Sequence, residues 1–141
     1  MQVSTQLLYR ISAVLLLMFA AGHQLGFRRI KPEWGVDGVV NAMKSTRFTV
    51  DGFGRTYYGF YAGFGFFVTV ALLFMAVTAW QLGGLTRDQL RPLGLIAWSL
   101  AAAMIVDTWF SWRYFFIAPG VFSTLVALAL VIAAWQVRAG P

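Results

Sequence analysis

The chain has 141 residues, of which 60% are hydrophobic and 11% charged, and these values indicate one compact unit that is solvated mostly by lipid. The absence of cysteine excludes disulfides, thiolate metal sites and thiol nucleophiles. The net charge of +6 fits attraction to anionic lipid head groups, and without a basic stripe on a soluble domain it does not indicate nucleic-acid binding.

Four apolar segments predict four membrane-spanning helices. A helix of roughly 20 residues crosses a hydrocarbon core of about 30 Å, and each segment reaches about that length. The segments do not alternate between polar and apolar residues as barrel strands do, so we predict helices. The predicted spans are residues 7–27, 57–82, 93–110 and 121–137. The fold class is therefore all-α, an integral membrane four-helix bundle that forms a single transmembrane domain over residues 1–141.

The long connection between the first two spans, residues 28–56, has room for structure of its own. Within it, apolar residues recur at helical spacing and polar residues fall elsewhere on the helical wheel. The apolar positions are Val36, Val39, Val40 and Met43, and the polar positions are Asp37, Asn41 and Lys44. This pattern predicts a short amphipathic helix that lies on the membrane or caps the bundle. A turn follows at Asp51–Gly54.

Glycine and proline mark the ends of the remaining spans. Gly83 and Gly84 end the second span as residues that tolerate a positive φ angle. Pro92 opens the third span near its first turn, where a missing N–H group leaves no hydrogen bond unmade. Pro119 and Gly120 are predicted to separate the third span from the fourth.

Lysine and arginine are divided unequally between the two sides of the predicted bundle. The side of the long loop carries Arg28, Arg29, Lys31, Lys44, Arg47, Arg55 and Arg113. The opposite side carries Arg10, Arg87, Arg91 and Arg138, near the tryptophans of an expected interfacial belt, Trp80, Trp98 and Trp135. The positive-inside rule therefore predicts a multi-pass protein of the cell inner membrane with the long loop in the cytoplasm.

Unusual polar residues concentrate on the side of the long loop. Because the four predicted spans alternate in direction, one end of each span lies on this side. Asp107 is the most informative of them, because a carboxylate inside a membrane span costs roughly 2.5–3.5 kcal/mol to insert and normally has a partner. Candidate partners are His23, Arg55 and Arg113. Three interpretations stay open for Asp107: an ion pair that fixes the third helix, a functional group that exchanges a proton or anchors a ligand, and a side chain that snorkels to the interface.

His23 is the only histidine of the sequence. It is interpreted either as a hydrogen-bonded residue between helices or as an acid–base group coupled to Asp107, and the two residues form the predicted catalytic pair. One histidine does not supply two axial haem ligands within one chain. The sequence also lacks the His/carboxylate helix pair of a di-metal site, so no metal site and no cofactor are predicted.

Aromatic and basic side chains gather at the same predicted face. They are typical either of an interfacial girdle or of a pocket for a flat apolar ligand. The predicted ligand-binding residues are Arg55, Tyr58, Tyr61, Trp109, Trp112, Arg113 and Trp34. Two G-x-x-x-G steps, Gly22–Gly26 and Gly59–Gly63, are typical of closely packed membrane helices. Such packing is expected to bring His23 near Tyr58 or Tyr61.

Three motifs stand at span ends. G-H-x-x-G ends the first span at Gly22–Gly26, R-[ST]-Y-x-x-F-Y-x-G-F-G opens the second at Arg55–Gly65, and W-R-Y-F-F precedes the last at Trp112–Phe116. Together they resemble a family of small uncharacterised bacterial integral membrane proteins with four helices. The resemblance covers the whole chain; it implies the four-span fold and carries no activity.

We therefore expect a membrane protein that binds a small lipophilic molecule in an aromatic-lined pocket at one membrane face. Isomerisation, cyclisation or epoxide opening would suit the Asp107 and His23 pair, since these reactions need acid–base groups and no cofactor. The alternative is a non-catalytic accessory subunit of a larger membrane complex; a transporter or channel would require an oligomer. The expected partners are membrane lipid, the lipophilic molecule, and other membrane subunits or a second copy of the chain, without nucleic acid.

Overall fold

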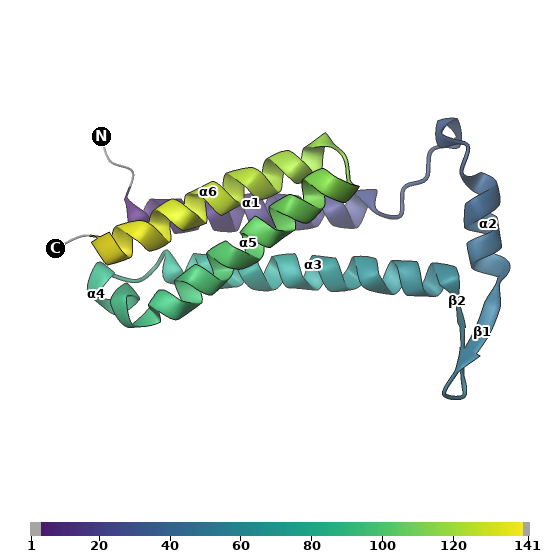
Figure 1. Cartoon of the computed structure of the whole chain (residues 1–141), viewed down its shortest axis with the longest axis horizontal. Helices are drawn as coiled ribbons and strands as arrows, with labels where there is room; N and C mark the ends of the chain where they lie inside the picture. The colour runs from purple at the N-terminus through teal and green to yellow at the C-terminus, as the bar shows by residue number, and fades with distance from the viewer. Residues whose placement is uncertain (1–3, 140–141) are drawn as a thin grey trace. The chain divides into compact units, whose positions relative to one another are not determined.

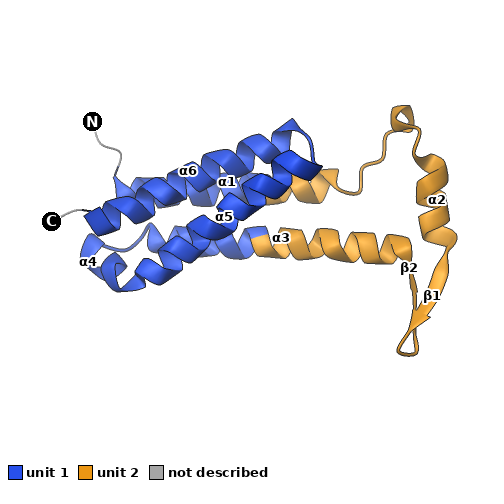
Figure 2. Cartoon of the chain, in the orientation of Figure 1, with its two compact units in different colours: residues 1–19, 72–141 blue, residues 20–71 orange. Residues whose placement is uncertain are grey.

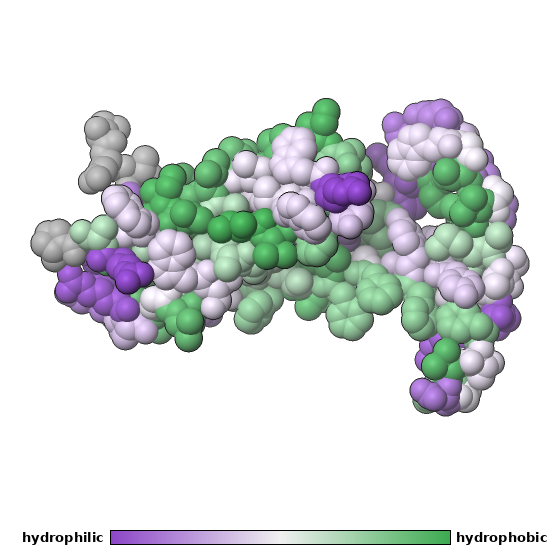
Figure 3. Space-filling model, in the orientation of Figure 1, coloured by the Kyte–Doolittle hydropathy of each residue, from purple (hydrophilic) through white to green (hydrophobic). Residues whose placement is uncertain are grey.

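The computed structural model describes residues 4–139 and is built mainly of helices. Four helices are long and apolar enough to cross a membrane, so the chain is an all-α, multi-pass membrane protein (Figure 1). They are α1 (Thr5–Gly26), α3 (Tyr57–Leu82), α5 (Gly94–Tyr114) and α6 (Ile117–Ala139). Figure 3 shows hydrophobic residues along the lengths of these helices, as expected for surfaces that contact lipid.

The chain divides into two compact units, which Figure 2 shows in different colours. Unit 1 comprises residues 1–19 and 72–141, and unit 2 comprises residues 20–71. Helices α1 and α3 each contribute to both units.

In unit 1, α5 and α6 lie side by side and form most of the packed interior (Figure 1). Small buried residues line α6 along one side: Gly120, Ser123, Ala127, Ala133 and Ala134. Small side chains let the backbones of two membrane helices approach closely, and the gain in dispersion contacts then stabilises the pair. Larger side chains, led by Met104 of α5 and Leu130 of α6, fill the rest of this interior.

The connection between α5 and α6 is shorter than predicted. Helix α5 continues to Tyr114, and α6 begins at Ile117, so only Phe115 and Phe116 join them. Pro119 therefore lies within the first turn of α6 instead of ahead of it. A proline fits there because the first N–H groups of a helix have no partner within the helix.

Gly83 and Gly84 follow α3 as predicted, but for a different physical reason. Neither has a positive φ angle, since the glycines with positive φ are Gly35 and Gly52. A methyl group on Gly83 would lie 3.0 Å from Cγ of Arg10 and 3.1 Å from the carbonyl oxygen of Gln6. Glycine at this position allows the end of α3 to pack against α1 within unit 1.

A short helix that was not predicted, α4 (Arg87–Leu90), follows α3. A capping box begins it: the Thr86 backbone N–H donates to Oε1 of Gln89 at 2.9 Å. The 3₁₀ helix η2 (Arg91–Leu93) then holds Pro92 directly before α5, close to its predicted place. The chain thus turns from α3 into α5 through two short helices.

Unit 2 contains the long connection between the first two spans. It forms a 3₁₀ helix η1 (Pro32–Trp34), helix α2 (Asp37–Ser45) and strands β1 (Arg47–Val50) and β2 (Phe53–Thr56). The amphipathic helix is confirmed: Val36, Val40 and Met43 are half-buried on one side, although Val39 is exposed. The predicted turn joins two antiparallel strands, with Val50 opposite Phe53.

The two G-x-x-x-G steps do not bring helices together. A methyl group on Gly22, Gly26 or Gly63 would meet nothing within 4 Å. The close approach of α1 and α3 in unit 2 is made instead at Gly65, where an added methyl group would overlap the ring of Phe27. The ring of Phe27, one residue beyond the end of α1, and the missing side chain of Gly65 on α3 set this spacing.

Candidate functional site

Asp107 lies on the buried side of α5 in unit 1. It follows Leu100 and Met104 by seven and three positions and precedes Ser111 by four, and all three of these residues are buried. The Asp107 side chain is itself half-buried. Its Oδ2 atom is shielded from solvent and accepts no hydrogen bond from any residue in 4–139. An unpartnered buried carboxyl oxygen is costly, so this atom is the least satisfied acceptor of the span.

The neighbouring hydroxyl and indole groups are already engaged. Thr108 donates to the carbonyl oxygen of Met104 at 2.7 Å. Nε1 of Trp112 donates to Oγ1 of Thr124 at 3.0 Å, which ties the indole to α6. Trp112 therefore acts as a link between two helices, whereas Oδ2 of Asp107 has no hydrogen-bond partner among the described residues.

An aromatic group surrounds the end of α5 near Asp107. The ring centroids of Trp109 and Phe110 are 5.0 Å apart, and those of Phe110 and Tyr114 are 6.0 Å apart. The Arg113 guanidinium lies 5.4 Å from the ring centroid of Tyr114. Trp109 is 59% exposed and Phe110 45%, so these rings face outward, where lipid or a lipophilic molecule would contact them.

His23 lies near the end of α1 in unit 2 and is half-buried. Its Nδ1 atom is 3.1 Å from Oγ1 of Thr69 on α3. The Thr69 hydroxyl has one proton, which it donates toward Oε1 of Gln24 or the carbonyl oxygen of Gly65. With that proton on either oxygen, the neutral His23 ring donates from Nδ1–H to Oγ1; in the opposite tautomer, Nδ1 accepts from the Thr69 hydroxyl.

Three aromatic residues extend this cluster within unit 2. The His23 and Phe27 rings stack, with centroids 5.0 Å apart and planes at 14°. The Tyr61 hydroxyl donates to the carbonyl oxygen of Phe27, and the ring centroids of Tyr58 and Tyr61 are 6.1 Å apart. Lys44 of α2 lies 5.1 Å from the ring centroid of Tyr58. His23 thus has the hydrogen-bonded interhelix environment that was one of its two predicted interpretations.

Two predicted ligand-binding residues of unit 2, Arg55 and Trp34, are exposed. Arg55 is exposed in β2, where Nη1 donates to the carbonyl oxygen of Gly54 and the guanidinium stacks near Phe53. Trp34 is exposed in η1. The contacts of Arg55 are thus with its own hairpin, not with the cluster around His23.

The predicted site residues therefore fall into two groups. Asp107, Trp109, Trp112 and Arg113 belong to unit 1, and His23, Tyr58, Tyr61, Arg55 and Trp34 belong to unit 2. The partner found for His23 is Thr69, which no sequence signal marked. A threonine such as Thr69 is common in an apolar span. Only the register of α1 against α3 identifies it as the partner of His23.

The opposite end of unit 1 was not predicted to hold a site. A cavity of about 550 Å³ lies there, lined by Arg91, Gly94, Ala97, Trp98, Ala134, Val137 and Arg138. Its two arginines were counted only for membrane orientation. Arginine at the ends of two helices that pack together, with small residues between, was the available signal.

Comparison with protein families, with characterised proteins and with solved structures found no match. The resemblance to a family of four-helix bacterial membrane proteins therefore stays a prediction. Within residues 4–139 no group of three or more His, Cys, Asp or Glu side chains is placed to hold a metal ion.

Proposed function

We propose that the protein binds a small lipophilic molecule inside the bilayer and holds its polar end at Asp107. The observation that carries this proposal is the buried Oδ2 atom without a hydrogen-bond partner on α5. Insertion of such a group costs roughly 2.5–3.5 kcal/mol, and a ligand donor or acceptor would offset that cost. At the same end of α5, the rings of Trp109 and Phe110 face outward and offer apolar contact to such a molecule.

The chemistry of such a site follows from the carboxyl group. A carboxyl group donates a proton to a carbonyl, hydroxyl or epoxide oxygen, or accepts one from carbon or an amine. Isomerisation, cyclisation and epoxide opening are the acid–base reactions that fit a bound lipophilic molecule. The ligand-binding proposal rests on Asp107 alone and does not require that a reaction follows.

Replacement of Asp107 by leucine tests the proposal. Wild-type protein purified in mild detergent should carry a lipophilic molecule that solvent extraction and mass spectrometry identify, and Asp107→Leu should lose it. Because Oδ2 of Asp107 has no hydrogen-bond partner within residues 4–139, Asp107→Leu should melt at the same or a higher temperature than wild type.

Thr108→Val is the matched control, since the Thr108 hydroxyl bonds only within its own helix turn. This variant should keep the molecule. Unfolding of Asp107→Leu would show that Asp107 is structural, and an unchanged extract would show that it anchors nothing.

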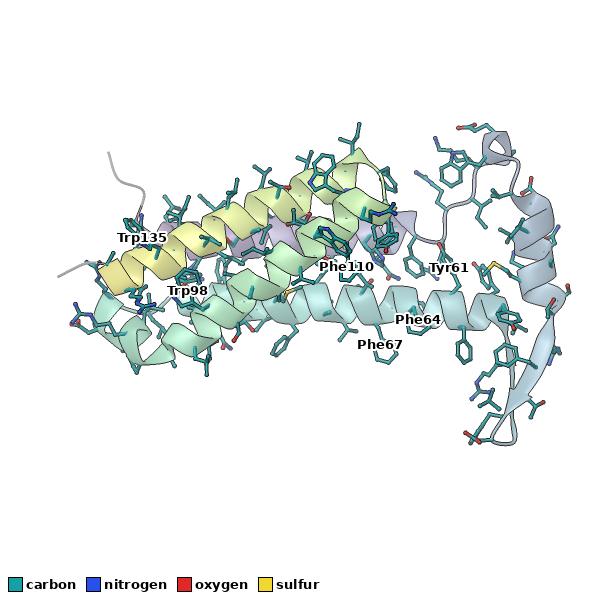
Figure 4. The ribbon with its side chains drawn as sticks, in the orientation of Figure 1. Tyr61, Phe64, Phe67, Trp98, Phe110 and Trp135 are labelled. Carbon is teal, nitrogen blue, oxygen red and sulfur yellow. The ribbon has the colours of Figure 1, made fainter. Side chains whose placement is uncertain are left out.

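The accessory-subunit alternative is favoured by one observation on α3. Phe64 is 66% exposed and Phe67 74%, and both project from the same edge of the helix (Figure 4). Rings of this size on one helix face suit a neighbouring membrane helix as well as lipid. Photo-crosslinkers placed at Phe67 should capture a second polypeptide if the chain is such a subunit, and only lipid if it is not.

We also propose the inner membrane of a bacterium as the location, with the long loop in the cytoplasm. The proposal rests on seven lysine and arginine residues on the loop side against four on the other.

A further inference from the structure

The cavity at the end of unit 1 combines an apolar floor with a basic rim. Its volume is about 550 Å³, within the range of known ligand pockets. The floor consists of Ala97, Ala134 and Val137, which are at most 5% exposed. The rim consists of Arg91, Trp98 and Arg138, which are exposed. The space exists because Gly94, Ala97 and Ala134 have small side chains or none, whereas larger side chains at these positions would fill it.

Positive charge exceeds negative charge around this cavity. Arg10 and Arg87 lie at the same end as the two rim arginines. Among the described residues, the acidic side chain at this end is Asp88 of α4. Arg87 adjoins the cavity wall, because its guanidinium donates to the carbonyl oxygen of Gln136, the residue before Val137. Figure 3 shows hydrophilic residues gathered at the α4 end of unit 1.

Two of these guanidinium groups have donors that the described residues leave unused. Nη1 of Arg10 and Nε of Arg87 are buried without a hydrogen-bond partner in residues 4–139. Arg10 is held in place by the Gly83 carbonyl oxygen at 3.3 Å and by the Trp80 ring, 3.8 Å from its guanidinium carbon. Fixed and unsatisfied cationic donors create a local field that attracts an anion.

The tryptophans indicate the depth at which the cavity opens. Trp98 on α5 and Trp135 on α6 both lie toward the α4 end of unit 1 (Figure 4). Tryptophan concentrates at the level of lipid head groups, where its ring is apolar and its N–H group reaches water. A molecule at this depth presents a head group to the rim and an acyl chain to the floor.

We propose that this cavity binds the phosphate group of an anionic phospholipid. Guanidinium groups bind phosphate oxygens with paired, charge-assisted hydrogen bonds, and Arg91 of η2 and Arg138 of α6 both line the rim. The floor of Ala97, Ala134 and Val137 accepts the start of the acyl chain. An anionic head group is favoured over a zwitterionic one, because the ammonium of the latter meets the same excess of positive charge.

Native mass spectrometry of the detergent-purified protein tests the proposal. Wild type should retain phosphatidylglycerol with about tenfold preference over phosphatidylcholine of the same chain length. The double variant Arg91→Gln/Arg138→Gln should bind both lipids equally. The double variant Arg29→Gln/Arg47→Gln removes the same two charges from exposed positions of unit 2 and should keep the wild-type preference.

A second variant tests the cavity itself without a change of charge. A methyl group on Gly94 meets nothing within 4 Å, so the backbone accepts a side chain there. Gly94→Leu should fill the cavity and lose the retained phosphatidylglycerol, with a melting temperature close to that of wild type.

Several outcomes would overturn the proposal. They are equal binding of the two lipids by wild type, an unchanged preference in Arg91→Gln/Arg138→Gln or in Gly94→Leu, and an equal loss in Arg29→Gln/Arg47→Gln. Displacement of the lipid by inorganic phosphate at the same concentration would also overturn it, since the site would then bind a soluble anion.

Discussion

At the scale of single residues, Gly120 decides how closely α5 and α6 approach each other. A methyl group added to it would lie 2.7–3.0 Å from three ring atoms of Trp112. The indole has little freedom to move away, because its N–H group donates to Thr124 and Thr124 donates in turn to the Gly120 carbonyl oxygen at 2.6 Å. The ring, the hydroxyl and the glycine form one closed contact.

Gly120→Ala should therefore destabilise the protein by about 1–3 kcal/mol, as insertion of a methyl group into a packed interior does. Thermal melting in detergent measures the effect. Gly94→Ala is the matched control in the same unit, since its added methyl group meets nothing within 4 Å. Equal melting temperatures for the two variants would contradict the close packing of Trp112 on Gly120.

Of the two central residues, Asp107 could be predicted from the sequence, whereas the environment of His23 could not. The cost of a carboxylate in lipid is a property of the residue type, so Asp107 could be identified without a structure. The partner of His23 could not, because it depends on the register of α1 against α3. Glycine spacing predicted Tyr58 or Tyr61, whereas the contact of Phe27 with Gly65 places Thr69 beside the imidazole.

At the scale of elements, the hairpin β1–β2 depends on two residues with left-handed backbone angles. Asp51 has a φ of 50° and Gly52 a φ of 83°, which suits a two-residue turn between twisted antiparallel strands. The sequence predicted this turn but not the strands. Each strand has four residues, and Gly54 and Arg55 interrupt any alternation of apolar and polar side chains.

Gly52→Ala should loosen the hairpin, because a side chain at positive φ costs roughly 1–2 kcal/mol. Amide hydrogen exchange should accelerate across residues 47–56. Gly54→Ala is the control: Gly54 lacks a positive φ, and its added methyl group meets nothing within 4 Å. If both variants exchange alike, the turn geometry does not hold the hairpin.

At the scale of the whole molecule, the four spans were predictable and the two units were not. Apolar length alone fixes the number of crossings, and the second span was predicted with the bounds that α3 has. The division into units depends on which helix segments pack together. Hydropathy does not encode this, because a lipid-facing leucine and a buried leucine are equally apolar.

The membrane orientation can be tested with unusual clarity because the chain has no cysteine. Ser45→Cys and Asp88→Cys each introduce one thiol at an exposed position, and one span, α3, separates them. A membrane-impermeant thiol reagent applied to intact cells should label Asp88→Cys, whereas Ser45→Cys should react only after permeabilisation. The reverse labelling would overturn the cytoplasmic placement of the long loop.

The two-residue connection between α5 and α6 bears on how the chain is made. Helix α5 carries Asp107 and emerges from the ribosome first, with an insertion penalty that its leucines and alanines offset only in part. Helix α6 follows after Phe115 and Phe116 and carries no charge before Arg138. The pair can enter the translocon as one hairpin, so that the strongly apolar later helix secures the weaker earlier one and Asp107 meets α6 before it meets lipid.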